Sequence, residues 1–199
     1  MSKIDELLQD LCPDGVEFRS LGSIASVETG KQLNRTSMSD IGEYPVLNGG
    51  INPSGFYHFY NTEAQSIAIS QGGASAGYVN FMRVKFWAGA HCFVVKPTSD
   101  CIIIKYLYYI LKREQAKFME AKLGAGIPGL NKKVLTDCYI PIPPLPVQQE
   151  IVRILDKFTE LEVELEAELE AELEARKKQY EYYRNKLLTF KNRAETQGN

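Results

Sequence analysis

The sequence has no long apolar run, no closely spaced cysteine pair and few histidines. No apolar stretch reaches the about 18 residues that a membrane-spanning helix requires, so no transmembrane protein is expected. The N-terminal residues MSKIDELLQD are polar and amphipathic, unlike a signal peptide. The four cysteines are Cys12, Cys92, Cys101 and Cys138, and no two of them form a C-x-x-C pair. We therefore expect reduced thiols in a cytoplasmic protein.

Motifs for catalysis and metal binding are also missing. The glycine-rich QGGASAG at 71–77 lacks the Lys-Ser/Thr of a P-loop; it is either a set of tight turns or a loop whose backbone approaches a phosphate or base. NPSGF at 52–56 has Ser54 where the N-P-P-[FY] motif of adenine methyltransferases has proline, so we expect a turn there. His58 and His91 are the only histidines, and no metal site or nucleophilic triad is expected. The sequence predicts a chain with no catalytic residues of its own.

The negative charge is concentrated in one segment. The net charge is −2, but residues 160–174 contain eight glutamates and no basic residue. The rest of the chain has 23 basic and 17 acidic residues, a balance of +6. The acidic average therefore describes that segment, and the remaining surface is compatible with a nucleic-acid partner.

Composition divides the chain into a mixed region at 1–145, a predicted long helix at 146–190 and a polar tail at 191–199. The helical region has no glycine and only one proline, Pro146, which suits the first helical position. Glu150 suits the positive N-terminal end of a helix. At 1.5 Å per residue this helix would be roughly 65 Å long.

Apolar residues form a stripe along the predicted helix. The spacing is ordinary as far as Phe158, and leucines then recur every four residues from Leu161 to Leu173. Such a long helix needs a partner to bury its stripe; the alternative is a single solvated helix. The predicted interface residues are Ile154, Phe158, Leu161, Leu165, Leu169, Leu173, Tyr183 and Leu187. One four-residue unit adds about 6 Å, close to two base pairs of DNA, so the segment is suited to act as a spacer of variable length.

The region 1–145 reads as an α+β domain with a mixed sheet and large loops. Alternating short apolar runs and turn dipeptides are typical of this class. Strands are expected near 18–21, 65–70, 77–80, 90–96 and 138–142, and helices near 4–11 and 102–121.

Basic and amide residues gather in the predicted loops. Lysine and arginine bind phosphates, while Gln, Asn, Arg and Ser read base edges; each residue is otherwise an ordinary solvated loop residue. The candidate DNA-binding residues are Lys31, Gln32, Asn34, Arg35, Asn48, Gln71, Ser75, Lys122, Asn131, Lys132 and Lys133.

Several segments together closely resemble specificity subunits of type I restriction–modification systems. They are VLNGGINPSG, GASAGYV, GIPGLNKKVL, IPIPPLPVQQEIVRILDKF and ARKKQYEYYRNKLLTF, and the resemblance runs from about Val16 to Phe190. It implies two DNA-recognition domains held apart by two antiparallel helices, each domain reading half of a bipartite target. It also implies methyltransferase subunits that modify adenine, a restriction subunit that joins for cleavage, and variable four-residue repeats that set the gap.

This chain resembles half of such a subunit, with one recognition domain and one helix. The resemblance therefore implies an antiparallel homodimer that reads an interrupted palindrome in double-stranded DNA. No cofactor is expected on this chain, since S-adenosylmethionine would belong to the methyltransferase partner. Alternatives are a silent half-subunit cassette, a coiled-coil scaffold whose globular domain binds protein, and an independent enzyme.

Overall fold

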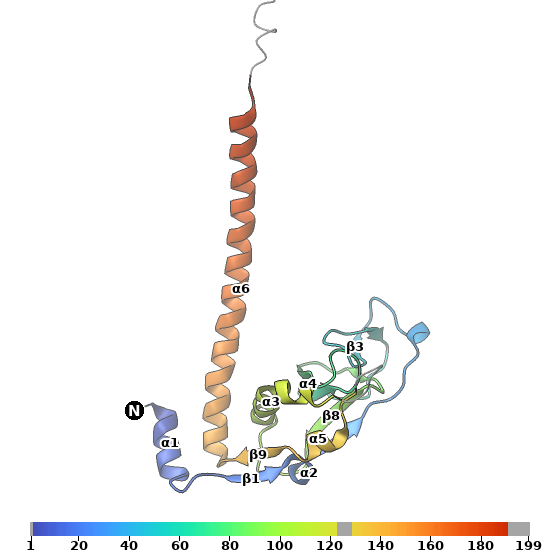
Figure 1. Cartoon of the computed structure of the whole chain (residues 1–199), viewed down its shortest axis with the longest axis vertical. Helices are drawn as coiled ribbons and strands as arrows, with labels where there is room; N and C mark the ends of the chain where they lie inside the picture. The colour runs from blue at the N-terminus through green and yellow to red at the C-terminus, as the bar shows by residue number, and fades with distance from the viewer. Residues whose placement is uncertain (1, 123–128, 191–199) are drawn as a thin grey trace, which may run out of the picture. The chain divides into compact units, whose positions relative to one another are not determined.

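The computed structural model describes residues 2–122 and 129–190, which form two compact units (Figure 1). The first unit ends at Val152 and the second begins at Arg153. The predicted polar tail at 191–199 lies outside the described residues. Within the described part of the chain, no helix combines the length and apolarity needed to cross a membrane.

A four-stranded antiparallel sheet organises the first unit. Its strand order is β2-β8-β5-β6, and every residue of the central strand β5 is buried. Side chains of successive residues point to opposite faces, so Ile67 and Ile69 join one hydrophobic cluster while Ala68 joins another. The strands are β2 (Ala25–Thr29), β5 (Ser66–Ser70), β6 (Val79–Met82) and β8 (Cys92–Pro97).

The two faces of this sheet are covered differently. On the face with Ile67, the cluster includes Leu107 and Leu111 of α3, which recur at helical spacing. On the other face, the cluster includes Leu47 and Ala88 from a second, three-stranded sheet. That sheet has the order β4-β3-β7, with β3 antiparallel to β4 and parallel to β7. The elements are β3 (Tyr44–Leu47), β4 (Gly55–Tyr57), β7 (Trp87–Ala88) and α3 (Ile104–Arg113). The predicted α+β class with a mixed sheet is confirmed.

The predicted helix at 102–121 is wrong as a single element. The chain forms α3 and then α4 (Gln115–Glu120), with Glu114 between them at φ −80° and ψ −3°. The side chains of Lys112 and Gln115 both bind Val79 in β6: Lys112 Nζ donates to its carbonyl at 3.0 Å, and Gln115 Oε1 accepts from its N–H at 2.9 Å. These bonds tie both sides of the break to the sheet.

Short elements complete the first unit. Strand β1 (Glu17–Ser20) pairs with β9 (Tyr139–Ile142) in a two-stranded ribbon, and both lie close to their predicted positions. Helix α1 (Lys3–Leu11), also predicted, begins with a capping box between Ser2 and Asp5. The sequence did not predict β2, β3, β4 or β7, nor the one-turn helices α2 (Leu21–Ile24), η1 (Arg35–Ser37) and α5 (Lys132–Thr136).

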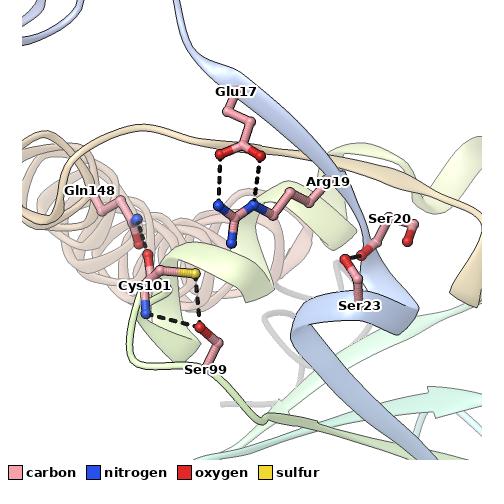
Figure 2. Close-up of polar contacts among 7 residues, drawn as sticks. All are labelled: Glu17, Arg19, Ser20, Ser23, Ser99, Cys101 and Gln148. Carbon is pink, nitrogen blue, oxygen red and sulfur yellow. Dashed lines mark hydrogen bonds and ion pairs between the residues drawn. The ribbon is translucent and has the colours of Figure 1, made fainter.

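Helix α6 (Leu145–Leu188) is one uninterrupted helix of 44 residues, confirming the predicted long helix (Figure 1). Its first turns belong to the first unit, and Gln148 there is fully buried. Gln148 Nε2 donates to the carbonyls of Cys101 and Pro143, both at 2.8 Å, and its Oε1 accepts from the N–H of Ile103 at 2.9 Å. Figure 2 shows the bond to Cys101. One side chain thus satisfies three backbone groups and fastens the start of α6 to the segment before α3.

Replacement of Gln148 by alanine should lower the free energy of unfolding by about 2–4 kcal/mol, because three partly buried backbone groups lose their partner. The neighbouring Gln149 is exposed, so Gln149→Ala is a matched control that should change stability by less than about 0.5 kcal/mol. Urea denaturation of both variants measures the difference. Equal losses would show that the hydrogen bonds of Gln148 contribute little.

Candidate nucleic-acid interface

Loops from four segments converge at one end of the four-stranded sheet. They follow β2, β3 and β5 and precede β8. Their backbones are joined by hydrogen bonds from Gly89 N to Leu47 O at 2.9 Å and from Gln71 N to His91 O at 2.8 Å. The segment before α5 joins them, since Leu130 N donates to Gln71 O at 2.7 Å. Residues far apart in sequence therefore share one connected loop surface.

Close backbone approach explains two glycines of this surface. A Cβ atom added to Gly30 would lie 2.3 Å from the carbonyl oxygen of Gly89, and one added to Gly89 would lie 2.3 Å from Asn48 Oδ1. Only residues without a side chain allow these three loops to meet. In QGGASAG, Gly73 and Gly77 have φ of +78° and +93°, so the tight-turn interpretation is correct for these two positions.

Three candidate DNA-binding residues line one pocket of about 490 Å³. Gln32 and Arg35 come from the segment after β2, and Asn48 comes from the end of β3. Asn48 Oδ1 accepts a hydrogen bond from His91 N at 3.2 Å, which orients its amide. Leu33, Met38 and Ser54 complete the lining that the structure describes.

The pocket lining has the chemistry of a base- or phosphate-binding surface. A guanidinium, two amides and the Ser54 hydroxyl offer both donors and acceptors, and two apolar side chains give a base something to contact. Ser54 was not singled out from the sequence as a binding residue. Its one signal was its place among the turn residues of NPSGF.

Several other candidate residues also have structural roles. Lys122 Nζ donates to the carbonyl of Ala74 at 3.0 Å, which ties the 71–77 loop to the end of α4. Asn131 caps α5, and its Oδ1 accepts from Lys133 N at 2.9 Å. The carbonyl of Lys31 accepts from the Trp87 indole at 3.0 Å.

The remaining candidates occupy positions around the converging loops. Asn34, Lys132 and Lys133 are exposed, whereas Gln71 and Ser75 are half-buried in the glycine-rich loop. The described lining of the 490 Å³ pocket includes none of these five residues. They therefore share the loop surface with the pocket without forming it.

Neither the cysteine nearest this surface nor the carboxylates of the described residues forms a reactive or metal-binding group there. Burial raises the pKa of the nearby Cys92 thiol to about 12, so it stays protonated at neutral pH and is a poor nucleophile. Within residues 2–122 and 129–190, no group of three or more His, Cys, Asp or Glu side chains is placed to hold a metal ion.

The predicted helix-interface residues all lie on α6. Ile154 is half-buried, whereas the other predicted positions have exposed fractions from 46% at Leu161 to 68% at Leu187. Ion pairs one turn apart, Glu172–Arg176 at 2.7 Å and Glu174–Lys178 at 2.8 Å, support the helix where the acidic segment ends.

Replacement of Gly30 by alanine should destabilise the protein by about 1–3 kcal/mol, because the new methyl group meets the backbone of the 88–89 turn. Gly72→Ala is the control: its Cβ would meet nothing closer than His91 Nδ1 at 3.6 Å, so a change within about 0.5 kcal/mol is expected. Thermal unfolding of the two variants provides the comparison. Similar melting temperatures for both would contradict the close packing of the loops.

Known proteins are similar to this chain in sequence and in fold. The family model for the type I restriction modification DNA specificity domain matches residues 13–175. A Haemophilus influenzae protein named as a type I restriction enzyme specificity subunit is 36% identical over 181 residues, covering 87% of this chain and 46% of that protein. A Mycoplasma pneumoniae protein named as a type I specificity subunit is 40% identical over 141 residues, covering 67% of this chain and 42% of its own length.

Among solved structures, a type I restriction–modification S subunit from M. genitalium has the same fold. The TM-score is 0.66 at 24% identity, covering 74% of this chain and 40% of that one. This chain spans about half the length of the curated relatives it matches. Because the family model covers most of the sequence, the chain belongs to the family of type I restriction–modification DNA specificity domains.

Proposed function

We propose that this chain is the non-catalytic DNA-reading subunit of a type I restriction–modification complex. The observation that carries the proposal is the pocket that brings Gln32 and Arg35, from the segment after β2, together with Asn48, from the loop after β3. The side chains there can bond to base edges, while Lys31, Lys132 and Lys133 are exposed elsewhere in the first unit and are suited to hold phosphates. The relatives are named as specificity subunits, which supports the same role for this chain.

The proposed functional form is an antiparallel homodimer joined through α6. Leu161, Leu165, Leu169 and Leu173 are all about half exposed, and burial of one leucine side chain stabilises by about 1.5–3 kcal/mol. A second copy of the same helix offers the apolar surface that they need. A two-fold symmetric dimer places two identical reading surfaces on the DNA, so the target is an interrupted palindrome.

The chemistry would come from partner subunits. A methyltransferase subunit would bind S-adenosylmethionine and modify adenine, and a restriction subunit would join for cleavage. One solved structure with the same fold, at TM-score 0.64, comes from a study of complex assembly in the type I system, which supports this arrangement. We place the complex in the cytoplasm, where it has access to DNA.

Selection from random duplex DNA tests the proposal. The purified chain, together with a co-expressed methyltransferase subunit, is expected to enrich an interrupted palindrome at low salt. A coiled-coil scaffold with a protein-binding domain would enrich no sequence and would have no DNA affinity to lose as salt rises. A silent cassette would also enrich nothing by itself, but would gain activity when joined to a second recognition domain.

Replacement of Arg35 by alanine should weaken binding to the selected site by about 10- to 100-fold, since a good base-edge pair contributes 1–3 kcal/mol of discrimination. Arg19→Ala is the matched control. Figure 2 shows the two bonds from Arg19 to Glu17 in the β1–β9 ribbon. Their lengths are 2.8 and 2.7 Å, and Arg19 is outside the described pocket lining. Fluorescence anisotropy at fixed salt measures both affinities; equal affinities for the two variants would exclude Arg35 from the reading surface.

Deletion of residues 165–168, LEAE, should shorten the preferred gap between half-sites by about two base pairs, because four residues account for about 6 Å of helix. The measurement is the same selection with the deleted chain in both copies. An unchanged gap would contradict the spacer role of α6 but not the reading role of the loops.

A further inference from the structure

The apolar stripe of α6 runs from Val147 to Leu187, and the spacing of its residues reads the same from either end. From Val147 to Leu187, the successive steps are 4, 3, 4, 3, 4, 4, 4, 3, 4, 3 and 4 residues. Only one of these positions, Arg176, lacks an apolar or aromatic residue. The midpoint of the series is at Ala167. Heptad-type spacing flanks a central block of three four-residue steps on both sides.

We infer that two copies of α6 pair antiparallel with their two-fold axis at the height of Ala167. This register rests on the homodimer proposed above and specifies it. Residues equidistant from Ala167 then lie opposite one another, so Leu165 of one copy faces Leu169 of the other, and Leu161 faces Leu173. Farther out, Ile154 faces Tyr180. A spacing that is its own mirror image fits a second copy of this helix better than an unrelated partner.

The exposed apolar surface is large enough for a stable dimer. Phe158 and Tyr180 are each 66% exposed, and at about 150–250 Å² per aromatic side chain the four rings of a dimer supply on the order of 500 Å². Leu161, Leu165, Leu169 and Leu173 are 46–60% exposed, and a dimer has two of each. Together with the rings they reach about 1,000 Å², the area that a specific interface needs.

Charges favour this register at the ends of the stripe and oppose it at the centre. Arg153 faces Glu181 and Asp156 faces Lys178, with opposite signs at equal heights. In contrast, the glutamates of 160–174 face the same segment of the other copy, and Lys157 faces Lys177. Exposed charge pairs contribute little compared with apolar burial, so the apolar match sets the register and the acidic centre weakens the dimer.

Helix α1 offers a contact for the outermost residues of the stripe. Val147 is buried in its own unit, so Leu187 of a second copy cannot reach it. The Lys3–Glu150 ion pair, at 3.1 Å, places α1 beside this turn of α6. Leu8 and Leu11 of α1 are 40% and 43% exposed, and they provide apolar surface at the height where Tyr183 and Leu187 of the other copy end.

Disulfide trapping in the full chain tests the register. Chains carrying Leu161→Cys and chains carrying Leu173→Cys, distinguished by tags and co-expressed, should cross-link to each other under mild oxidation. Each variant alone should not, because its two cysteines would be about 18 Å apart along the axis, beyond the about 7 Å that a disulfide spans between Cα atoms. The parent chain controls for its four native cysteines.

Other cross-linking outcomes would overturn the register and leave the proposed DNA-reading function untouched. Preferential cross-linking of Leu165→Cys with Leu173→Cys would move the axis to Leu169. Self-cross-linking of one single variant would move the axis to that residue, and self-cross-linking of both single variants would indicate a parallel pair. Sedimentation equilibrium of the full chain at 20 μM, above a dissociation constant on the order of 1 μM, measures the dimer directly. A monomer under these conditions would overturn the homodimer and the register together.

Salt dependence gives a second, independent readout. The Debye length falls from about 10 Å at 0.1 M salt to about 3 Å at 1 M, which screens the facing glutamates. The dissociation constant of the dimer should therefore fall by about threefold or more over this range. A dimer that weakens as salt rises would show that the acidic segment lies against the basic residues near 176–186, and would overturn the register.

Discussion

Burial of β5 and β8 on both faces is the constraint on which the first unit depends. Ile67, Ile69, Phe93 and Val95 fill one cluster with α3, while Ala68, Cys92 and Val94 fill the other against the three-stranded sheet. Neither strand can shift by one residue without exchanging the two sets of side chains. The ends of these strands fix where the glycine loops begin, so the geometry of the candidate reading surface follows from the core.

The residues that shape the loop surface are largely distinct from those that project from it. The close approach of Gly30 to Gly89 and the bond from His91 N to the Asn48 side chain define its shape, so Asn48 both supports the surface and lines the pocket. Gln32 and Arg35 instead come from an exposed segment and line the pocket. Exchange of the projecting side chains therefore changes what the surface can bind without disturbing the backbone contacts beneath it. Gln148 has a comparable supporting role for α6, since its bonds to backbone groups depend little on which residues carry the neighbouring side chains.

The sequence predicted the elements with strong periodicity and missed those whose pattern is short. Helix α6, α1 and strands β5, β8 and β9 were identified because their apolar spacing is clear. Strand β7 has only two residues, and it pairs with β3 across about 40 residues of sequence, so this pairing depends on tertiary contacts that no local pattern shows. The break at Glu114 was also missed, and the bonds from its flanking residues to Val79 are tertiary contacts of the same kind. For the candidate site, residue type suggested Gln32, Arg35 and Asn48, but only the fold brings them together with Ser54.

The mirror symmetry of the α6 stripe makes the number of central steps consequential. In the proposed pair, three four-residue steps place the axis between Leu165 and Leu169, so each central leucine would pack on a different leucine of the other copy and none would meet its own equivalent. Two or four steps would keep the mirror symmetry but place a leucine on the axis against itself. Chains with an even number of central steps should therefore tolerate a polar residue at the central leucine less well than chains with an odd number. When that leucine lies on the axis, one substitution places two identical polar side chains in direct contact. Insertions that are not multiples of four residues break the symmetry, so in the proposed pair the four-residue unit is the step by which this helix can lengthen and keep the self-match.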